Sequence, residues 1–286
     1  MSKEADYFNM AFLSEASYVD FTPSNGYSDL VIGAALQDRD RNGRFTEAQA
    51  SSFVSTWRVL HHQPDTDSGF SATLFQHKTS GRYVVGFRGT ADWEDLIITD
   101  GSDIVLDGLA IDQIVDMYNY WQRLITPDGQ TYQSAYLETL QEESTGLAIA
   151  KAGQFVPGFD LTSDAYLEWL YSRRDIVIDN GVGERVRAIK FAPSDEAFSD
   201  GRQFGVGGPD WVLDAGGVDV TGHSLGGHLA VAFARLFPEV GAAAVTINGA
   251  GFATGGVPGL GGDAGINVRN LYGTLAGDQD FCFPGD

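Results

Sequence analysis

The sequence is poor in cysteine, in basic residues and in long apolar runs. Its 286 residues include one cysteine, Cys282, so no disulfide can form within the chain. There are 18 Lys and Arg but 39 Asp and Glu, which gives a formal net charge of -21. Such an acidic surface repels phosphate groups, so we expect no nucleic-acid partner and no long-range attraction to anionic membranes.

The apolar residues are also too dispersed for a membrane span or an export signal. A spanning helix needs about 18 consecutive apolar residues, and no such run occurs. The first residues, MSKEADYFNMAFLSEASY, are interrupted by acids and polar side chains, which argues against a cleaved signal peptide. We therefore expect no transmembrane segment. These features suit a cytoplasmic protein, or one exported by a route that reads another signal.

Apolar residues are nevertheless abundant enough, at 43%, for a large core, and the length suits one α/β domain over 1–286 with an insertion. Periodicity predicts helices and strands in alternation, which favours a mostly parallel sheet with helices on both faces. Residues 126–210 are interpreted as the insertion, because no linker rich in Pro and Ser bounds them. The expected helices are 7–18, 48–57, 107–125 and 225–237, and the expected strands are 57–62, a hairpin over 70–90, 216–224, 242–249 and 268–277.

The residues Gly222-His223-Ser224-Leu225-Gly226 fit the pattern G-x-S-x-G. In a nucleophile elbow this pattern turns a strand sharply into a helix and exposes the serine hydroxyl. The predicted strand before it and helix after it are the context that the motif requires. We therefore predict that Ser224 is a nucleophile and that the Leu225 N–H helps to hold an oxyanion. The alternative is a tight, glycine-rich turn with a structural role.

A second oxyanion donor is needed, because losing one such donor typically costs about 3–4 kcal/mol in the transition state. The stretch VVGFRGTADWED, residues 84–95, follows a predicted buried strand. Gly89 lets the backbone bend so that the Thr90 N–H can face inward. Taken alone, this stretch favours an ordinary strand end with a polar cap.

Together, FRGTADWED and GHSLGGHLA resemble the class 3 lipase family of the α/β-hydrolases. They also resemble related bacterial lipases and phospholipases A1 that are exported without a cleaved signal peptide and often carry C-terminal calcium-binding repeats. The resemblance covers about 70–107 and 218–284. It implies an α/β-hydrolase-like fold with Ser224 as nucleophile, Thr90 and Leu225 as the oxyanion hole, and an inserted lid or cap region. It further implies an extracellular location by a leaderless route, a lipid ester substrate met at a lipid interface, and no required cofactor.

The remaining triad members are expected in the order Asp, then His. An acid at the end of the predicted strand 268–277 would orient the base, and we favour Asp280, with Asp278 as the alternative. Either acid could instead cap a loop or bind a cation. No histidine follows Asp280. We therefore interpret the fold as truncated before its base, so that this chain would have a low residual activity.

A candidate cation loop lies in DRDRNG, where Asp38, Asp40 and Asn42 occupy positions one, three and five of an EF-hand-like pattern. Gln49 replaces the Glu expected at position twelve, and two arginines oppose a cation. The spacing of the three oxygen donors nevertheless predicts Ca²⁺ as a ligand. The alternative is a solvated turn.

The resulting functional hypothesis is a triacylglycerol lipase that cleaves carboxylic ester bonds with a serine nucleophile. The alternatives are a phospholipase A1 and a catalytically inactive domain of the same fold that binds a hydrophobic ligand. The sequence specifies no oligomeric state.

Overall fold

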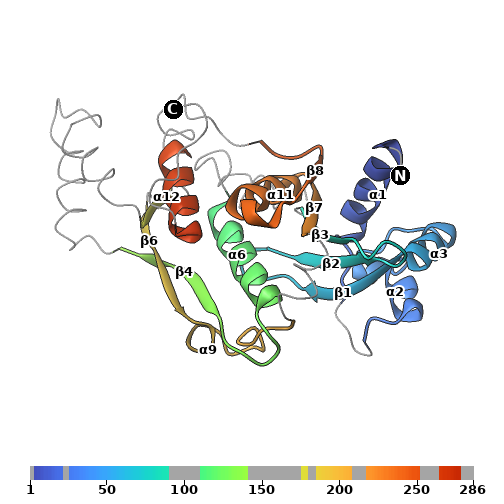
Figure 1. Cartoon of the computed structure of the whole chain (residues 1–286), viewed down its shortest axis with the longest axis horizontal. Helices are drawn as coiled ribbons and strands as arrows, with labels where there is room; N and C mark the ends of the chain where they lie inside the picture. Colours follow the sequence, from blue (N-terminus) through green and yellow to red (C-terminus); the bar gives the residue numbers. More distant parts are fainter. Residues whose placement is uncertain are drawn as a thin grey trace. The chain divides into compact units, whose positions relative to one another are not determined.

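A computed structural model describes residues 3–21, 26–89, 110–140, 175–179, 185–207, 217–251 and 264–277 of the chain (Figure 1). The chain divides into two compact units. Within the described ranges, the first contains a five-stranded sheet and its covering helices, and the second contains a three-stranded sheet and the helix of residues 264–276. The single domain that we expect over 1–286 stays a prediction.

The first unit is built from the following elements. Its helices are α1 (Lys3–Ala16), α2 (Asp29–Ala35), η1 (Arg39–Arg41), α3 (Glu47–Thr56), α6 (Ile111–Ile125), α9 (Ser194–Ala197), α11 (Leu225–Leu236) and η3 (Pro238–Val240). Its strands are β1 (Trp57–Gln63), β2 (Ala72–His77), β3 (Tyr83–Phe87), β7 (Val218–His223) and β8 (Ala244–Ile247). The expected hairpin is confirmed as β2 and β3, and the expected strand and helix around the G-x-S-x-G pattern are confirmed as β7 and α11.

The five strands form one mixed sheet in the order β1-β2-β3-β7-β8. β1, β2 and β3 pair antiparallel, whereas β7 lies parallel between β3 and β8. Parallel pairing is thus confined to one half of the sheet that we expected to be mostly parallel. The reason is that short connections join β1, β2 and β3, and such connections allow only antiparallel neighbours.

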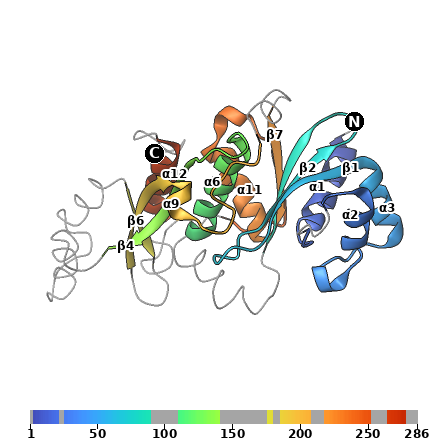
Figure 2. The ribbon, with the colours of Figure 1, turned by 90° about the horizontal axis from the view of Figure 1, so that it is seen from below.

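Helices cover both faces of this sheet, as expected. Neighbouring residues of β7 point to opposite faces and contact a different helix on each. The Thr221 hydroxyl donates to the Met10 carbonyl of α1 at 3.1 Å. Gly222 faces the other way, against Gly226 of α11. Figure 2 shows α1 and α11 on the two sides of β7. The fold is therefore α/β-hydrolase-like, with a strand-to-helix turn at the carboxyl edge of the parallel strands.

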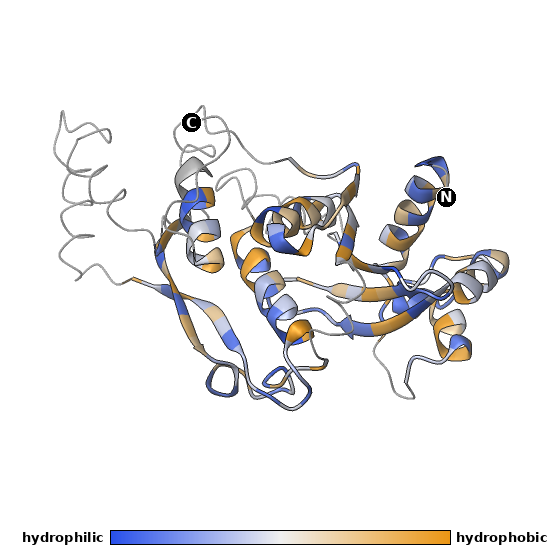
Figure 3. Ribbon diagram, viewed as in Figure 1, coloured by the Kyte–Doolittle hydropathy of each residue, from blue (hydrophilic) through white to orange (hydrophobic). Residues whose placement is uncertain are grey.

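The core of the first unit is aromatic and aliphatic and closes around the sheet. Met10 and Leu13 of α1, Phe53 of α3 and Phe75 of β2 are all fully buried in one cluster. On the other face, α6 buries its apolar stripe, and Figure 3 shows the bands of apolar and polar residues around this helix. No helix in the described part of the chain is long and apolar enough to span a bilayer.

The second unit corrects one expectation. Its strands β4 (Gln133–Thr139), β5 (Ile176–Asp179) and β6 (Arg185–Pro193) form a sheet in the order β4-β6-β5, and α12 (Ala264–Ala276) packs on β5. Residues 268–277 were expected to form a strand, and this is wrong. The buried Val268, Leu271, Tyr272 and Leu275 follow helical spacing, so that one face of a helix is apolar.

Candidate active site

Ser224 lies between β7 and α11 in a backbone conformation that residues other than glycine rarely adopt. Its φ is 54° and its ψ is -123°. Such a conformation costs of order 1–3 kcal/mol and persists only when the surroundings impose it. Here the Ser224 N–H donates to the Ile247 carbonyl at 3.2 Å, and its carbonyl accepts from the N–H groups of Gly227 and Ala250, both at 2.9 Å. Two neighbouring segments therefore hold the strained turn in place.

The two glycines of the pattern are required by backbone crowding. A Cβ on Gly222 would lie closer than 3.0 Å to the backbone of Gly226. A Cβ on Gly226 would lie equally close to the carbonyl oxygen of Phe87, at the end of β3. Both neighbours are main-chain atoms, which cannot rotate away as a side chain can. Backbone crowding is therefore the physical reason for glycine at both positions.

The Ser224 hydroxyl is not used by the helix that follows it. Serine commonly caps a helix by accepting from the N–H two or three residues on, but Ser224 makes no such capping bond. Its side chain is half-buried, so solvent reaches it. Leu225 is the first residue of α11, where N–H groups lack an intrahelical acceptor and the helix dipole is positive. The Ser224 hydroxyl, which makes no capping bond, thus lies next to the backbone N–H of Leu225, and this N–H could donate to an anion.

The end of β3 comes directly against this turn. β3 and β7 pair so that Phe87 lies opposite Gly222. Two residues further on, a Cβ on Gly89 would lie 3.4 Å from the Cβ of Ser224. The chain therefore passes Ser224 immediately before Thr90. Thr90 itself, the predicted second oxyanion donor, lies outside the described residues, and so do Asp278 and Asp280, the two predicted triad acids.

All five histidines lie in the described ranges, and none hydrogen-bonds to the Ser224 hydroxyl. His223 precedes Ser224, and its Nδ1 lies 3.1 Å from the hydroxyl of Tyr18. His228 is fully buried in α11, next to the backbone of Ala250 and Gly251, and burial lowers its pKa to about 4. His223 thus contacts Tyr18, and His228 is enclosed in the helix that follows the turn.

The other three histidines belong to β1 and β2. Burial, reinforced by the positive charge of Arg123, lowers the pKa of His61 to about 3. His62 is buried and its Nδ1 pairs with the Thr73 hydroxyl at 2.9 Å. His77 accepts from the Ser80 N–H at 3.1 Å. These three imidazoles lie within β1 and β2, and none of these contacts involves Ser224.

The predicted cation loop adopts a compact local structure. The Asp38 carboxylate accepts from the Asp40 N–H at 3.0 Å and caps η1, and Asn42 ends this turn with φ of 60°. Gln49, which occupies the twelfth position of the pattern, forms a capping box with Thr46 at the start of α3. Among the described residues, no three His, Cys, Asp or Glu gather as metal ligands. The loop thus has a structural role of its own.

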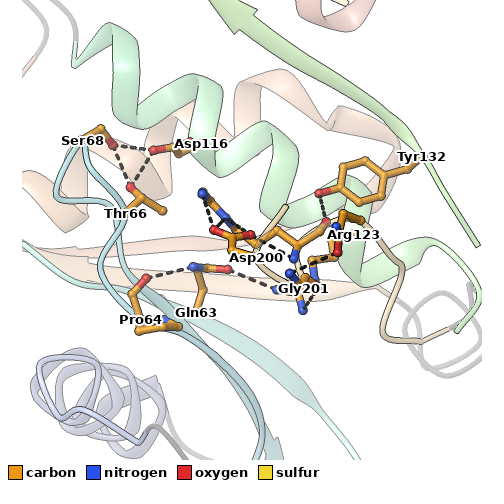
Figure 4. Close-up of polar contacts among 11 residues, drawn as sticks. Gln63, Pro64, Thr66, Ser68, Asp116, Arg123, Tyr132, Asp200 and Gly201 are labelled. Carbon is orange, nitrogen blue, oxygen red and sulfur yellow. Dashed lines mark hydrogen bonds and ion pairs between the residues drawn. The ribbon is translucent and has the colours of Figure 1, made fainter. Parts of the chain in front are cut away.

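A partly buried acid, Asp116, which no sequence motif indicates, lies on α6. Asp116 accepts hydrogen bonds from the hydroxyls of Thr66 and Ser68, both at 2.6 Å, as Figure 4 shows. Burial raises the pKa of Asp116, and the two hydroxyl donors oppose that shift. The only sign of this contact in the sequence is that the acidic Asp116 lies among apolar residues of a predicted helix. The bonds attach the loop after β1 to α6.

Further along α6, Arg123 donates to the Gln63 side chain at 3.3 Å and to the Gly201 carbonyl at 3.2 Å (Figure 4). The cavity between these groups and Asp116 has a volume of about 10 Å³. That is room for about one water molecule, so no organic substrate fits there. This polar cluster is therefore structural, and Ser224 remains the candidate site.

Comparisons with known proteins add a distant structural similarity. No protein-family model matches the chain, and no curated protein matches it in sequence. A similar solved structure is the Lip2 lipase from Yarrowia lipolytica, at 16% identity and a TM-score of 0.34. The match covers 87% of this chain and 61% of that chain, so this chain spans less than two thirds of the lipase. A similarity this low does not define an activity.

Proposed function

We propose that this protein is a serine hydrolase that cleaves carboxylic ester bonds of lipids, with Ser224 as the nucleophile. The observation that carries the proposal is the strained Ser224 backbone, held between two glycines that no other residue could replace. Strain of this kind concentrates at functional sites, because a purely structural turn could relieve it with glycine. In the proposed reaction Ser224 Oγ attacks the ester carbonyl, and the N–H groups of Leu225 and Thr90 hold the oxyanion.

The rest of the mechanism follows the triad logic. Asp280, with Asp278 as the alternative, would orient an imidazole that removes the Ser224 proton and returns it to the leaving alcohol. No histidine in the described ranges hydrogen-bonds to the Ser224 hydroxyl, so we expect a low rate of hydrolysis.

Fluorophosphonate labelling tests the nucleophile. The purified protein should be labelled at Ser224, and Ser224→Ala should not be labelled. Added imidazole should accelerate labelling, because a free base can replace one that the site lacks. Absence of labelling with and without imidazole would remove Ser224 as a nucleophile.

The substrate is proposed to be a triacylglycerol, with phospholipase A1 activity as the alternative. Acid release from triolein and from phosphatidylcholine vesicles, followed at constant pH, separates the two. Activity on soluble short-chain esters alone would contradict both. We also propose an extracellular location by a leaderless route. The secreted protein should then be found in the culture medium with its N-terminal residues uncleaved.

A second candidate is a non-catalytic domain that binds a hydrophobic ligand. The observation that favours it is that no histidine in the described ranges hydrogen-bonds to the Ser224 hydroxyl. This function predicts tight binding of a lipid or fatty acid that is unchanged in Ser224→Ala, together with no labelling.

Calcium binding at Asp38, Asp40 and Asn42 is a separate proposal that rests on the spacing of their oxygen donors. Calorimetric titration should show calcium heat that is lost in Asp38→Ala. Because Asp38 also caps η1, the thermal midpoint of the variant without calcium serves as the control for a folding effect.

A further inference from the structure

The hydroxyl of Tyr18 contacts both segments that meet at Ser224. Tyr18 is the second residue after α1 and is separated from the turn by more than 200 residues. Its oxygen lies 3.1 Å from Nδ1 of His223, the residue before Ser224. The same oxygen and the His223 carbonyl oxygen lie within 2.5 Å of the place that a Cβ on Gly89 would occupy, so only glycine fits there.

We propose that Tyr18 is a positioning residue of the oxyanion hole, whose hydroxyl holds Gly89 against the strand-to-helix turn. This inference rests on the proposed function. Gly89 is the last residue before Thr90, so the contact sets the direction in which the chain leaves β3. Tyr18 restricts the backbone conformations available to the chain after β3. This matters because an oxyanion donor is effective only when its N–H already points to the position of the oxyanion.

The Tyr18 hydroxyl lies between Gly89 and His223. It can donate to His223 Nδ1 when that imidazole carries its proton on Nε2, which leaves Nδ1 as the acceptor. Burial raises the pKa of Tyr18, so the phenol keeps the proton that it donates.

The end of α1 is itself fixed to β3. The Ser17 hydroxyl donates to the Phe87 carbonyl at 3.2 Å, and the Arg88 N–H donates to the Ser71 carbonyl at 3.0 Å. Successive residues of the β3 exit are therefore held at Phe87, Arg88 and Gly89, the last of them by Tyr18. Sheet pairing alone ends at Phe87. Beyond that residue the path of the chain depends on these contacts.

The test is Tyr18→Phe, which removes only the hydroxyl. Its matched control is Tyr27→Phe, because the Tyr27 hydroxyl also accepts a backbone N–H, that of His62 at 3.0 Å, in the same unit. We expect fluorophosphonate labelling of Ser224 to be about tenfold slower in Tyr18→Phe and unchanged in Tyr27→Phe, at comparable thermal midpoints. Equal labelling rates in Tyr18→Phe and the unmodified protein would overturn the inference.

A second measurement separates this inference from the proposed function. Amide hydrogen exchange at Gly89 should be about tenfold faster in Tyr18→Phe, while exchange at Val85 in the middle of β3 stays the same. If the unmodified protein is not labelled at all, the hydrolase proposal fails, and the exchange at Gly89 still decides whether Tyr18 positions this segment. Unchanged exchange at Gly89 would refute the positioning role whatever the labelling shows.

Discussion

The substitution Gly226→Ala tests the close approach of α11 to β3 on which the site depends. The added Cβ would lie closer than 3.0 Å to the Phe87 carbonyl oxygen and 3.0 Å from the carbonyl carbon of Arg88, where ordinary contacts begin at 3.4 Å. Backbone must therefore move. Overpacking of this kind costs about 1–3 kcal/mol, and we place Gly226→Ala at the upper end because no side chain can rotate away. Alanine recovers up to about 1 kcal/mol of helix propensity, which leaves a net loss of about 2 kcal/mol.

The matched control is Gly33→Ala in α2, where the nearest atom to the added Cβ is Val54 Cγ1 at 3.7 Å. Both substitutions gain the same helix propensity, but only Gly226→Ala meets backbone. Urea unfolding should therefore show Gly33→Ala to be as stable as the unmodified protein or more so, and Gly226→Ala to be less stable than either. Fluorophosphonate labelling should also fall in Gly226→Ala, because the displaced backbone leads to Gly89. Equal unfolding midpoints for the two variants would refute the crowding argument.

Three further predictions concern strain, protonation and buried polar contacts. Ser224→Gly should raise the free energy of unfolding by about 1 kcal/mol, because glycine adopts the positive φ freely, and should abolish labelling; a loss of stability would contradict the strain. Between pH 6.5 and pH 4 the unfolded state gains a proton at His228 that the folded state does not bind, so stability should fall as the pH falls, by up to about 3 kcal/mol. The urea midpoint of His228→Asn should depend less on pH than that of the unmodified protein, and equal dependence would exclude this histidine as a source. Asp116→Ala should lower the free energy of unfolding by about 2 kcal/mol, because the hydroxyls of Thr66 and Ser68 lose their acceptor, whereas Asp116→Asn should lose less; equal losses in urea unfolding would contradict that assignment.

The strand-to-helix turn at Ser224 could be predicted because the sequence signals for it are local. The glycines at 222 and 226, the preceding apolar run and the following amphipathic stripe lie within about twenty residues of one another. A Cβ on Gly222 would meet the backbone of Gly226 in the same turn, whereas a Cβ on Gly226 would meet Phe87 at the end of β3. Local patterns of this kind are where sequence interpretation is strongest.

The C-terminal helix α12 shows where the local argument failed. The stretch VRNLYGTLAG was interpreted as a strand because apolar residues recur in it, and its carboxyl end then suggested a place for a triad acid. Its apolar residues in fact recur at helical spacing, and the helix ends at Ala276, before Gly277 with φ of 70°. Helical spacing and strand alternation are easily confused over ten residues, so the strand argument for Asp278 and Asp280 does not hold.

The sequence by itself determined the kind of turn that holds Ser224, because that turn follows from residues adjacent in the chain. It could not determine that Gly89 and the hydroxyl of Tyr18 meet the turn, because contacts across about 135 and 205 residues leave no periodic trace in a single sequence. It also could not assign the five histidines, since an imidazole acts as a base only where folding leaves it beside the hydroxyl. The tertiary structure decided both, through the parallel pairing of β3 with β7 and the packing of α1 against them.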